Sequence, residues 1–278
     1  IASEFRYDPL PDLFPGEVAI LISQSGETAD TLAAMERLHE LKVPVIGIVN
    51  TSGSTLDRRS DVSIPLLAGP EIGVASTKAF TAQLIVLARI VLHAASQRGM
   101  DKLRLRSLHE ALASVPDLMQ VVLHNEPAVI EAADAMKDAT STIFVGRGEL
   151  YPLACEGALK LKETSYIHAE GFAAGELKHG PIALIDNKMP VVALAGSSLL
   201  LGKLASNIRE IAARGGRIMT VGDRAAVLSL SDVSERMLTI PTMPEFVLPI
   251  VAALPLQLLS YHVATARGLN VDRPRNLA

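Results

Sequence analysis

The fold is decided at Glu17-Val18-Ala19-Ile20-Leu21-Ile22-Ser23-Gln24-Ser25-Gly26-Glu27-Thr28, where an apolar strand, a glycine turn and the start of a helix follow one another. Ligands of open parallel sheets bind outside the carboxyl ends of the strands. Backbone N–H groups at a helix start lack partners and attract anions. Hydroxyls at Ser23, Ser25 and Thr28 supply further donors, and Gly26 lets the backbone approach a ligand closely. The stretch therefore predicts a phosphate-binding loop at the end of a strand.

A simpler interpretation makes Ser25 the N-cap of the helix, with Thr28 in the place of the usual capping-box Glu or Gln. Capping accounts for one or two hydroxyls, whereas this loop has three hydroxyls and a glycine. We therefore favour phosphate binding. A second group of hydroxyls, at Ser76 and Thr77, opens a later helix. It either caps that helix or faces the same ligand, and the sequence leaves the two open.

Outward from this loop, apolar runs alternate with helical patterns on both sides of a purely helical middle. Continuous β-branched runs separated by helices are typical of parallel strands covered on both faces. We expect strands at 17–22, 43–49, 62–67, 141–145, 189–194, 217–221 and 237–240, and helices at 28–41, 77–97, 151–165, 198–214 and from 245 onward. The middle, 101–137, is expected to form two helices, with Pro116 and Pro127 near their starts. The pattern predicts two copies of one α/β unit.

Composition excludes several classes of protein. Hydrophobic residues make up 49% and charged residues 20% of the 278, which excludes intrinsic disorder. The net charge of −4, six Phe, four Tyr and no Trp argue against a nucleic-acid partner. The single cysteine, Cys155, excludes an internal disulfide and fits a reducing compartment, so we expect a cytoplasmic protein. The seven His are scattered and no Cys-x-x-Cys pair occurs, so we expect no metal site.

One uncharged run, Phe246 to Ala266, is long enough to span a membrane. It contains Pro249, Pro255 and His262, and we expect a helix buried in the core instead. We therefore expect no membrane partner. The N-terminus has no secretory signal and no initiating Met, which predicts a processed chain or one that begins inside a longer protein.

Six blocks of the sequence resemble one family of enzymes. They are the Ser-Gln-Ser-Gly-Glu-Thr loop and its continuation at 23–31, Glu-Ile-Gly-Val-Ala-Ser-Thr-Lys-Ala-Phe at 71–80, Glu-Gly-Ala-Leu-Lys-Leu-Lys-Glu at 156–163, His-Ala-Glu at 168–170, Gly-Glu-Leu-Lys-His-Gly-Pro at 175–181 and Asp-Arg-Pro-Arg-Asn-Leu-Ala at 272–278. The loop is similar to the sugar-phosphate loop of SIS (sugar isomerase) domains. The Lys-His-Gly-Pro and Pro-Arg-Asn-Leu-Ala blocks resemble, more narrowly, the isomerase half of the glutamine–fructose-6-phosphate aminotransferase (glucosamine-6-phosphate synthase) family.

The resemblance implies a fold and a division of the chain. It implies α/β architecture with two SIS-type three-layer αβα units that have parallel, flavodoxin-like sheets. The first SIS domain is expected at 1–104 and the second, with the helical spacer, at 105–268, followed by the start of a C-terminal tail at 269–278. The first domain is expected to lack its opening strand, whose Gly-Thr-Ser turn supplies another serine in the family. Family members also carry an N-terminal glutaminase domain, and a lysine that forms a Schiff base follows the position of Ala278.

The resemblance also implies the roles of single residues. The phosphate of fructose 6-phosphate would be held by Ser23, Gln24, Ser25 and Thr28, and the sugar would be contacted by Val74 and Ser76. Glu163 would shuttle a proton between C1 and C2, with Lys160 close to the reacting carbons. His179 would help to open the sugar ring of a neighbouring subunit, which implies a homodimer. Glucosamine 6-phosphate would be the product, and the family needs no cofactor for this step.

The chemistry of the reaction agrees with these residue types. Moving a proton between adjacent carbons needs one base that takes it from the first and returns it to the second. A carboxylate in a dry pocket can do this, and an ammonium group nearby favours its ionised form. Imidazole suits proton transfer between ring oxygens near neutral pH.

Plainer interpretations exist for the same residues. Glu156, Lys160 and Glu163 share one helix face, which without the family would be interpreted as a solvated face with one weak ion pair. Ala154, Ala158 and Leu161 fall on the opposite face, which is expected to pack on the sheet. His168 and His179 are equally placed on sequence grounds, and the resemblance alone separates them.

Other functions remain open at this point. One is an SIS phosphosugar isomerase, deglycase or deaminase without a glutaminase, and another is a non-catalytic sensor of sugar phosphates. In the second half of the chain, Gly196-Ser197-Ser198 occupies the place of the serine loop, but it lacks the Gly-x-Thr that follows Ser25. We expect no second phosphate site there.

Overall fold

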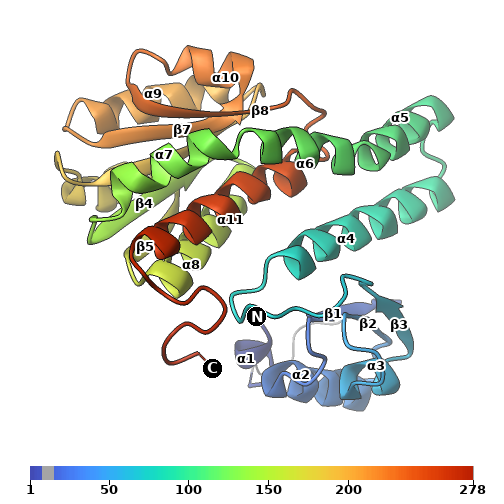
Figure 1. The fold of residues 1–278 in the computed structure, drawn as a ribbon. Coiled ribbons are helices and arrows are strands. Elements are labelled where there is room, and N and C mark those ends of the chain that lie inside the picture. Colours follow the sequence, from blue (N-terminus) through green and yellow to red (C-terminus); the bar gives the residue numbers. More distant parts are fainter. Residues whose placement is uncertain (8–15, 278) are drawn as a thin grey trace. The chain divides into compact units, whose positions relative to one another are not determined.

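The structure is a computed structural model, and it describes residues 1–7 and 16–277. The chain divides into two compact units (Figure 1). The first unit consists of Ile1–Ile72 and Ser76–Ile90, and the second of Gly73–Ala75 and Val91–Ala278. The short segment Gly73–Ala75 therefore belongs to the second unit, although it lies in the first half of the sequence.

The first unit is built on a three-stranded parallel sheet in the order β1-β2-β3. Its elements are α1 (Ala2–Phe5), β1 (Ala19–Ser23), α2 (Ala29–Glu40), β2 (Val45–Val49), α3 (Thr55–Arg59), β3 (Val62–Pro65) and the first part of α4 (Lys78–Gln97). The core joins β2 to α2 and α3 through Met35, Leu38, Val45, Val49 and Leu56. Among the described residues β1 pairs with β2 alone, so its other edge is open.

The second unit is built on a five-stranded parallel sheet in the order β5-β4-β6-β7-β8. Its strands are β4 (Ser141–Gly146), β5 (His168–Ala173), β6 (Pro190–Ala195), β7 (Arg217–Asp223) and β8 (Ser234–Ile240). Its helices include α8 (Leu150–Ser165), α9 (Leu201–Ala212), α10 (Arg224–Ser229) and α11 (Leu248–Ala266), and two short 3-10 helices are η1 (Ala174–His179) and η2 (Pro181–Leu184). Alternate residues of β4 face opposite layers: Ile143 and Val145 join the core with α9, whereas Phe144 lies against α8. The sheet thus lies between two helical layers (Figure 1).

The two sheets share one arrangement. The order β1-β2-β3 in the first unit matches β6-β7-β8 in the second, since both are runs of successive parallel strands that neighbour one another. The loop after β1 therefore corresponds to the loop after β6. The prediction of two copies of one parallel α/β unit is confirmed.

The helical middle differs from the prediction. We expected two helices over 101–137, but there are three: α5 (Lys102–Ala113), α6 (Val115–His124) and α7 (Glu126–Met136). Pro116 and Pro127 do lie in the first turns of α6 and α7. The prediction missed the break at Ser114, whose hydroxyl donates back to the Ala111 carbonyl. Because Ser114 is itself in the right-handed helical region, the break leaves little trace in the residue pattern.

The strand β5 was not predicted. It reads His-Ala-Glu-Gly-Phe-Ala, which has neither a continuous apolar run nor a clean alternation. Among the described residues it pairs with β4 alone, at the edge of the sheet, and Ala169 is the one fully buried residue of the strand, which explains the weak apolar pattern. Gly171 is required there, because a Cβ at this position would lie 2.5 Å from the Cys155 Cα of α8.

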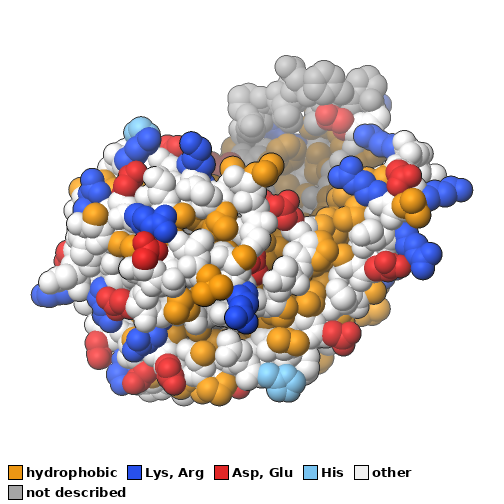
Figure 2. All heavy atoms as spheres, turned by 90° about the horizontal axis from the view of Figure 1, so that it is seen from above, with side chains coloured by type: hydrophobic (Ala, Val, Ile, Leu, Met, Phe, Trp, Pro, Cys, Tyr) orange, Lys and Arg blue, Asp and Glu red, His pale blue; other side chains and the backbone are white. Residues whose placement is uncertain are grey.

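Within the described residues two helices, α4 and α11, are long and apolar enough to span a membrane by length and composition. In α11 67% of the apolar window is buried within the structure, against 17% in α4. The expectation that 246–266 forms a buried helix holds for α11. On the face shown in Figure 2, Lys and Arg side chains are interspersed with Asp and Glu.

Candidate functional site

The predicted phosphate loop follows β1 and is closed by its own hydroxyls. Ser23 Oγ accepts a hydrogen bond from the Gly26 N–H (3.0 Å) and lies 3.0 Å from Thr28 Oγ1. Ser25 Oγ accepts the N–H of Glu27 (3.2 Å). The loop thereby gathers three hydroxyls at the carboxyl end of the strand.

The helix α2 begins directly after the loop, with Thr28 as its N-cap. The interpretation of Ser25 as N-cap is therefore wrong. The Thr28 side chain makes no capping hydrogen bond, because its hydroxyl faces Ser23 instead. The N–H groups of the first helical turn have no acceptor within the helix, and its dipole favours a negative charge at this end. The arrangement suits an anion.

The connection between β2 and α3, together with the first residues of α3, donates hydrogen bonds to this loop. The Gln24 carbonyl accepts the N–H groups of Asn50 (3.1 Å) and Thr51 (3.2 Å). The Gly26 carbonyl accepts the Leu56 N–H (3.0 Å), and Glu27 Oε1 accepts that of Thr55 (2.7 Å). Gly26 itself is buried with a φ of +70°. Bonds from both sides therefore hold the loop in one shape.

The two residues expected to contact the sugar are divided between the units, since Ser76 belongs to the first and Val74 to the second. In the first unit Ser76 Oγ donates to Glu71 Oε2 (3.2 Å), and the same oxygen accepts the Ala79 N–H (2.9 Å). Glu71 therefore accepts one N–H of the first turn of α4, and the Ser76 hydroxyl is bonded to the same carboxylate and not to the helix. In the second unit the Val74 N–H donates to the Asp272 carbonyl (3.1 Å).

The second unit holds a charged group on α8. The Lys160 ammonium donates to Glu163 Oε2 (2.8 Å) and lies 3.6 Å from Glu156 Oε1. It also donates to the Ala75 carbonyl. The three side chains are only 8%, 23% and 17% exposed for Lys160, Glu163 and Glu156. The solvated face of the plainer interpretation is therefore wrong, and the ammonium is buried between two carboxylates.

The opposite face of α8 packs as predicted. Ala154, Ala158 and Leu161 are fully buried. Gly157 brings the helix close to its neighbours, because a Cβ there would lie 2.9 Å from Leu256 of α11 and 3.0 Å from Phe144 of β4. Close packing on this side fixes the charged face on the other.

Glu156 was not among the predicted site residues. Burial of the carboxyl is the largest influence on its pKa and raises it, the attraction of Lys160 opposes the rise, and the neighbouring Glu163 adds to it. The net effect is a pKa above the ordinary glutamate value. The i, i+4 spacing to Lys160 was visible in the sequence, but the burial that distinguishes this pair from a surface pair was not.

His179 is not bonded to the charged group in the part of the chain that the structure describes. It ends η1, is exposed, and precedes Gly180, which has a φ of +145°. Among the described residues of the second unit no hydrogen bond joins its ring to Lys160 or Glu163. His168 is exposed on β5 and lies 3.6 Å from Glu170. The geometry of the second unit brings neither histidine into contact with the group on α8.

The loop after β6, which corresponds to the predicted phosphate loop, is occupied by a carboxylate of the chain itself. Asp223 Oδ2 accepts the Ser197 N–H (2.6 Å), and Asp223 Oδ1 accepts the Ser197 hydroxyl (2.5 Å). The same carboxylate accepts the N–H groups of Ala225 (3.0 Å) and Ala226 (3.1 Å) at the start of α10. These donors are already used, which is a physical reason to expect no phosphate there.

The Asp223 carboxylate should also contribute pH-dependent stability. Desolvation is the largest single influence and raises its pKa, but the hydrogen bonds from Ser197, Ala226 and Ala225 together outweigh it, so the pKa lies below the ordinary Asp value. Asp223→Asn should lower the free energy of unfolding at pH 7 by about 1–3 kcal/mol, because one buried acceptor is replaced by a donor.

A depressed folded-state pKa stabilises the fold above the unfolded pKa of about 3.9, and this stabilisation is lost as pH falls through the folded value. Urea unfolding at pH 7 and at about pH 3 gives the free energy of unfolding of wild type and Asp223→Asn. The gap between these two free energies should be smaller at pH 3 than at pH 7. Asp232→Asn, an exposed carboxylate paired with Arg209, is the control and should change little. A gap that is constant with pH would contradict the argument.

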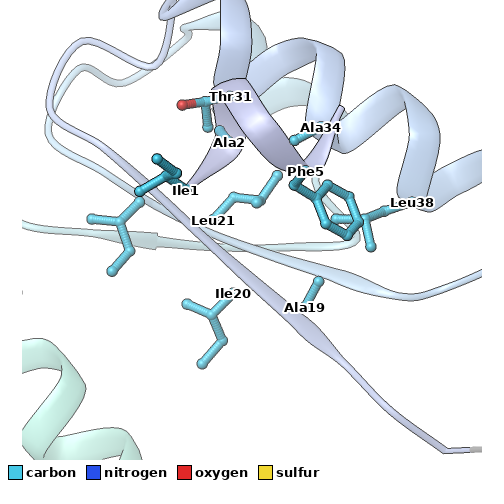
Figure 3. A pocket seen from close by; sticks show the side chains of 10 residues that line it. Ile1, Ala2, Phe5, Ala19, Ile20, Leu21, Thr31, Ala34 and Leu38 are labelled. Carbon is cyan, nitrogen blue, oxygen red and sulfur yellow. The ribbon is translucent and has the colours of Figure 1, made fainter. Parts of the chain in front are cut away.

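An open apolar cavity of about 650 Å³ lies along β1 in the first unit. It is lined by α1, β1 and α2, and Figure 3 shows the ring of Phe5 beside Leu38 and Ala34. Thr31 supplies the one hydroxyl among its lining side chains. The cavity lacks the donors that a phosphate needs and is not the candidate site. In the described parts of the chain no three His, Cys, Asp or Glu gather as metal ligands.

Two parallel α/β units and a hydroxyl loop at a strand end define the class of the protein. The chain belongs to the SIS domain family, whose model matches residues 1–92 and 135–267. This confirms the predicted family and fold class.

Within this family, the chain is similar to proteins that share one name. Glutamine–fructose-6-phosphate aminotransferase (isomerizing) of Brucella abortus biovar 1 (strain 9-941) is 49% identical over 279 residues, which are 100% of this chain and 46% of the relative. The protein of the same name from Chlorobaculum tepidum is 49% identical over 280 residues, covering 100% of this chain and 45% of the relative. A solved structure, the C-terminal domain of glucosamine-fructose-6-phosphate aminotransferase from Francisella tularensis, is 43% identical with a TM-score of 0.94, covering 98% of this chain and 77% of that one. The chain spans about half the length of the curated relatives it matches.

Proposed function

We propose that the chain is the isomerase part of a glutamine–fructose-6-phosphate aminotransferase. It would convert fructose 6-phosphate and ammonia to glucosamine 6-phosphate and water, with ammonia from glutamine in the full-length protein. The observation that carries this proposal is the buried group of Glu156, Lys160 and Glu163 on α8. Identity of 49% over the whole chain to relatives of that name supports it. The SIS domains are proposed at 1–104 and 105–268.

In this proposal the first unit binds the phosphate of the sugar. The hydroxyls of Ser23, Ser25 and Thr28 and the amide of Gln24 serve as donors. The helix start of α2 adds unpaired N–H groups and the positive end of a dipole. Val74 and Ser76 would contact the sugar carbons and hydroxyls. Hydroxyls and amides hold a phosphate without a cationic side chain, which agrees with the net charge of −4.

The second unit supplies the proton transfer. Glu163 would take a proton from C1 of the open-chain sugar and return it to C2, so that one base serves both carbons. The Lys160 ammonium, 2.8 Å away, favours the carboxylate form that accepts the proton. It is also a donor to an oxygen that gains negative charge during the transfer.

His179 would open the sugar ring in the site of a neighbouring subunit, and the protein would act as a homodimer. The exposure of His179 at the end of η1 supports this arrangement, as does the lack of a hydrogen bond from its ring to Lys160 or Glu163 among the described residues. An imidazole suits this proton transfer near neutral pH. We propose a cytoplasmic location, since the single thiol fits a reducing compartment.

The test is incubation of the full-length protein with fructose 6-phosphate and glutamine. Glucosamine 6-phosphate, measured by chromatography, should form in the wild type and fall at least tenfold in the double variant Ser25→Ala/Thr28→Val at low substrate concentration. Turnover of fructosamine phosphates without glutamine would point to a deglycase or deaminase. A melting temperature that rises with fructose 6-phosphate, while no product forms, would point to a sensor.

A further inference from the structure

The C-terminal segment after α11, residues 269–277, is folded into turns of its own. Asn270 Oδ1 accepts the N–H groups of Asp272 and Arg273, each at 3.0 Å. The Leu277 N–H donates to the Pro274 carbonyl (3.4 Å). These bonds shape the segment locally, but they do not attach it to the rest of the second unit.

The Leu269 N–H joins the start of the segment to the Ala264 carbonyl of α11 (3.0 Å), and Tyr166, the residue that ends α8, holds it further along. Tyr166 adopts the left-handed conformation, with a φ of +62°, directly after the helix that carries Lys160 and Glu163. Its hydroxyl accepts the backbone N–H of Arg275 (2.8 Å). The guanidinium of Arg275 lies over its ring, 4.2 Å from the ring centre. One side chain thus holds the segment by a hydrogen bond and a cation–π contact.

From the attached segment, contacts continue to the charged group. The Asp272 carbonyl accepts the Val74 N–H (3.1 Å), and the next residue, Ala75, presents its carbonyl to the Lys160 ammonium. All of these residues belong to the second unit. Lys160 has two carboxylates on its own helix, and the Ala75 carbonyl is the partner that comes from elsewhere. The position of the Ala75 carbonyl therefore depends on the short segment Gly73–Ala75, which is bonded to the C-terminal segment through Val74 and Asp272.

We propose that Tyr166 is a positioning residue for the isomerisation. It fixes the C-terminal segment to the end of α8, and through Asp272 and Val74 it keeps the Ala75 carbonyl beside Lys160. The ammonium is thereby directed between Glu163 and this carbonyl. The catalytic part of the inference rests on the proposed function, whereas the chain of contacts does not.

Hydrogen exchange of the full-length protein tests the contacts, with Tyr166→Phe as the variant. Phenylalanine keeps the ring over which Arg275 lies and removes only the hydroxyl. Amide exchange of the peptide covering 270–277 should become about fivefold faster, the change expected from one lost hydrogen bond. Exchange at 73–75 should rise with it. Tyr261→Phe is the control: this exposed tyrosine of α11 lies outside these contacts, and both peptides should exchange as in the wild type.

Steady-state kinetics of the same variant are the second measurement. In Tyr166→Phe kcat for glucosamine 6-phosphate formation should fall about fivefold, while KM for fructose 6-phosphate stays within twofold, because the proposed phosphate loop is untouched. An unchanged exchange rate at 270–277 would overturn the proposal. So would faster exchange at 270–277 while the exchange rate at 73–75 stays at the wild-type value. So would faster exchange at both peptides with wild-type kcat. A wild type that forms no product would refute the proposed function, and the exchange at 73–75 would still decide whether Tyr166 positions that segment.

Discussion

Glu163→Gln should lower the formation of glucosamine 6-phosphate by about 10³-fold, because general acid–base catalysis contributes roughly 10²–10⁴-fold and an amide cannot take a proton at neutral pH. Glutamine has nearly the same shape as glutamate and can still accept the Lys160 hydrogen bond at its carbonyl oxygen. The fold should therefore persist. Binding of fructose 6-phosphate should also persist, since the proposed phosphate donors lie in the first unit.

The measurement has two parts. Product formation is followed by chromatography, and binding is followed by isothermal titration with fructose 6-phosphate. In the variant kcat should collapse, while Kd should change by less than about threefold. If kcat and Kd both stay near wild type, Glu163 is not the base.

Glu156→Gln is the matched control, because it is the same substitution about two turns earlier on the same helix face. Its oxygen lies 3.6 Å from the Lys160 ammonium, against 2.8 Å for Glu163. Burial already raises the pKa of Glu156, so a neutral glutamine there costs little stability. Its kcat should fall much less than that of Glu163→Gln. Equal losses in the two variants would mean that the carboxylates act as a pair and that the base cannot be assigned to one of them.

Most of the parallel strands and the hydroxyl loop after β1 could be predicted because their signals are local. A buried parallel strand is a continuous apolar run, and the hydroxyls of the loop lie within six residues at the end of one. The shape of the loop also depends on local contacts, such as that between Ser23 and Thr28. A motif of this kind can be found without knowing the rest of the fold.

Other features depend on residues that are distant in the sequence. The burial of Lys160 depends on Ala75, 85 residues earlier, and the attachment of Arg275 on Tyr166, 109 residues earlier. Asp223 fills the second loop from the neighbouring strand, 26 residues after Ser197. No periodicity predicts such contacts, since they arise only when the sheet order brings strand ends and segments together. The missed break at Ser114 is different: it is local, but serine in a helix is an ambiguous signal.

Gly26→Ala should strongly weaken phosphate binding, because the added Cβ has no space in the loop. It would lie 2.0 Å from Ser54 Oγ and 2.6 Å from Ser54 Cβ, and Ser54 is buried. The backbone φ of +70° adds about 1–2 kcal/mol of strain for a residue with a Cβ. Since Gly26 lies between Ser25 and the N-cap Thr28, a displaced backbone separates the donors that must converge on one phosphate. Affinity for fructose 6-phosphate should fall at least tenfold, and the melting temperature should fall with it.

Two further variants separate the clash from the strain. Gly53→Ala has a nearly equal φ of +74°, but its Cβ would meet nothing within 4 Å, so it should lose some stability and keep its affinity. Ser54→Gly in the Gly26→Ala background removes both clashing atoms, and glycine is tolerated at the N-cap position that Ser54 holds on α3. The double variant should regain most of the affinity, as measured by titration with fructose 6-phosphate. If it stays as weak as Gly26→Ala while Gly53→Ala binds normally, the loop depends on the conformation of Gly26 alone and not on its contact with α3.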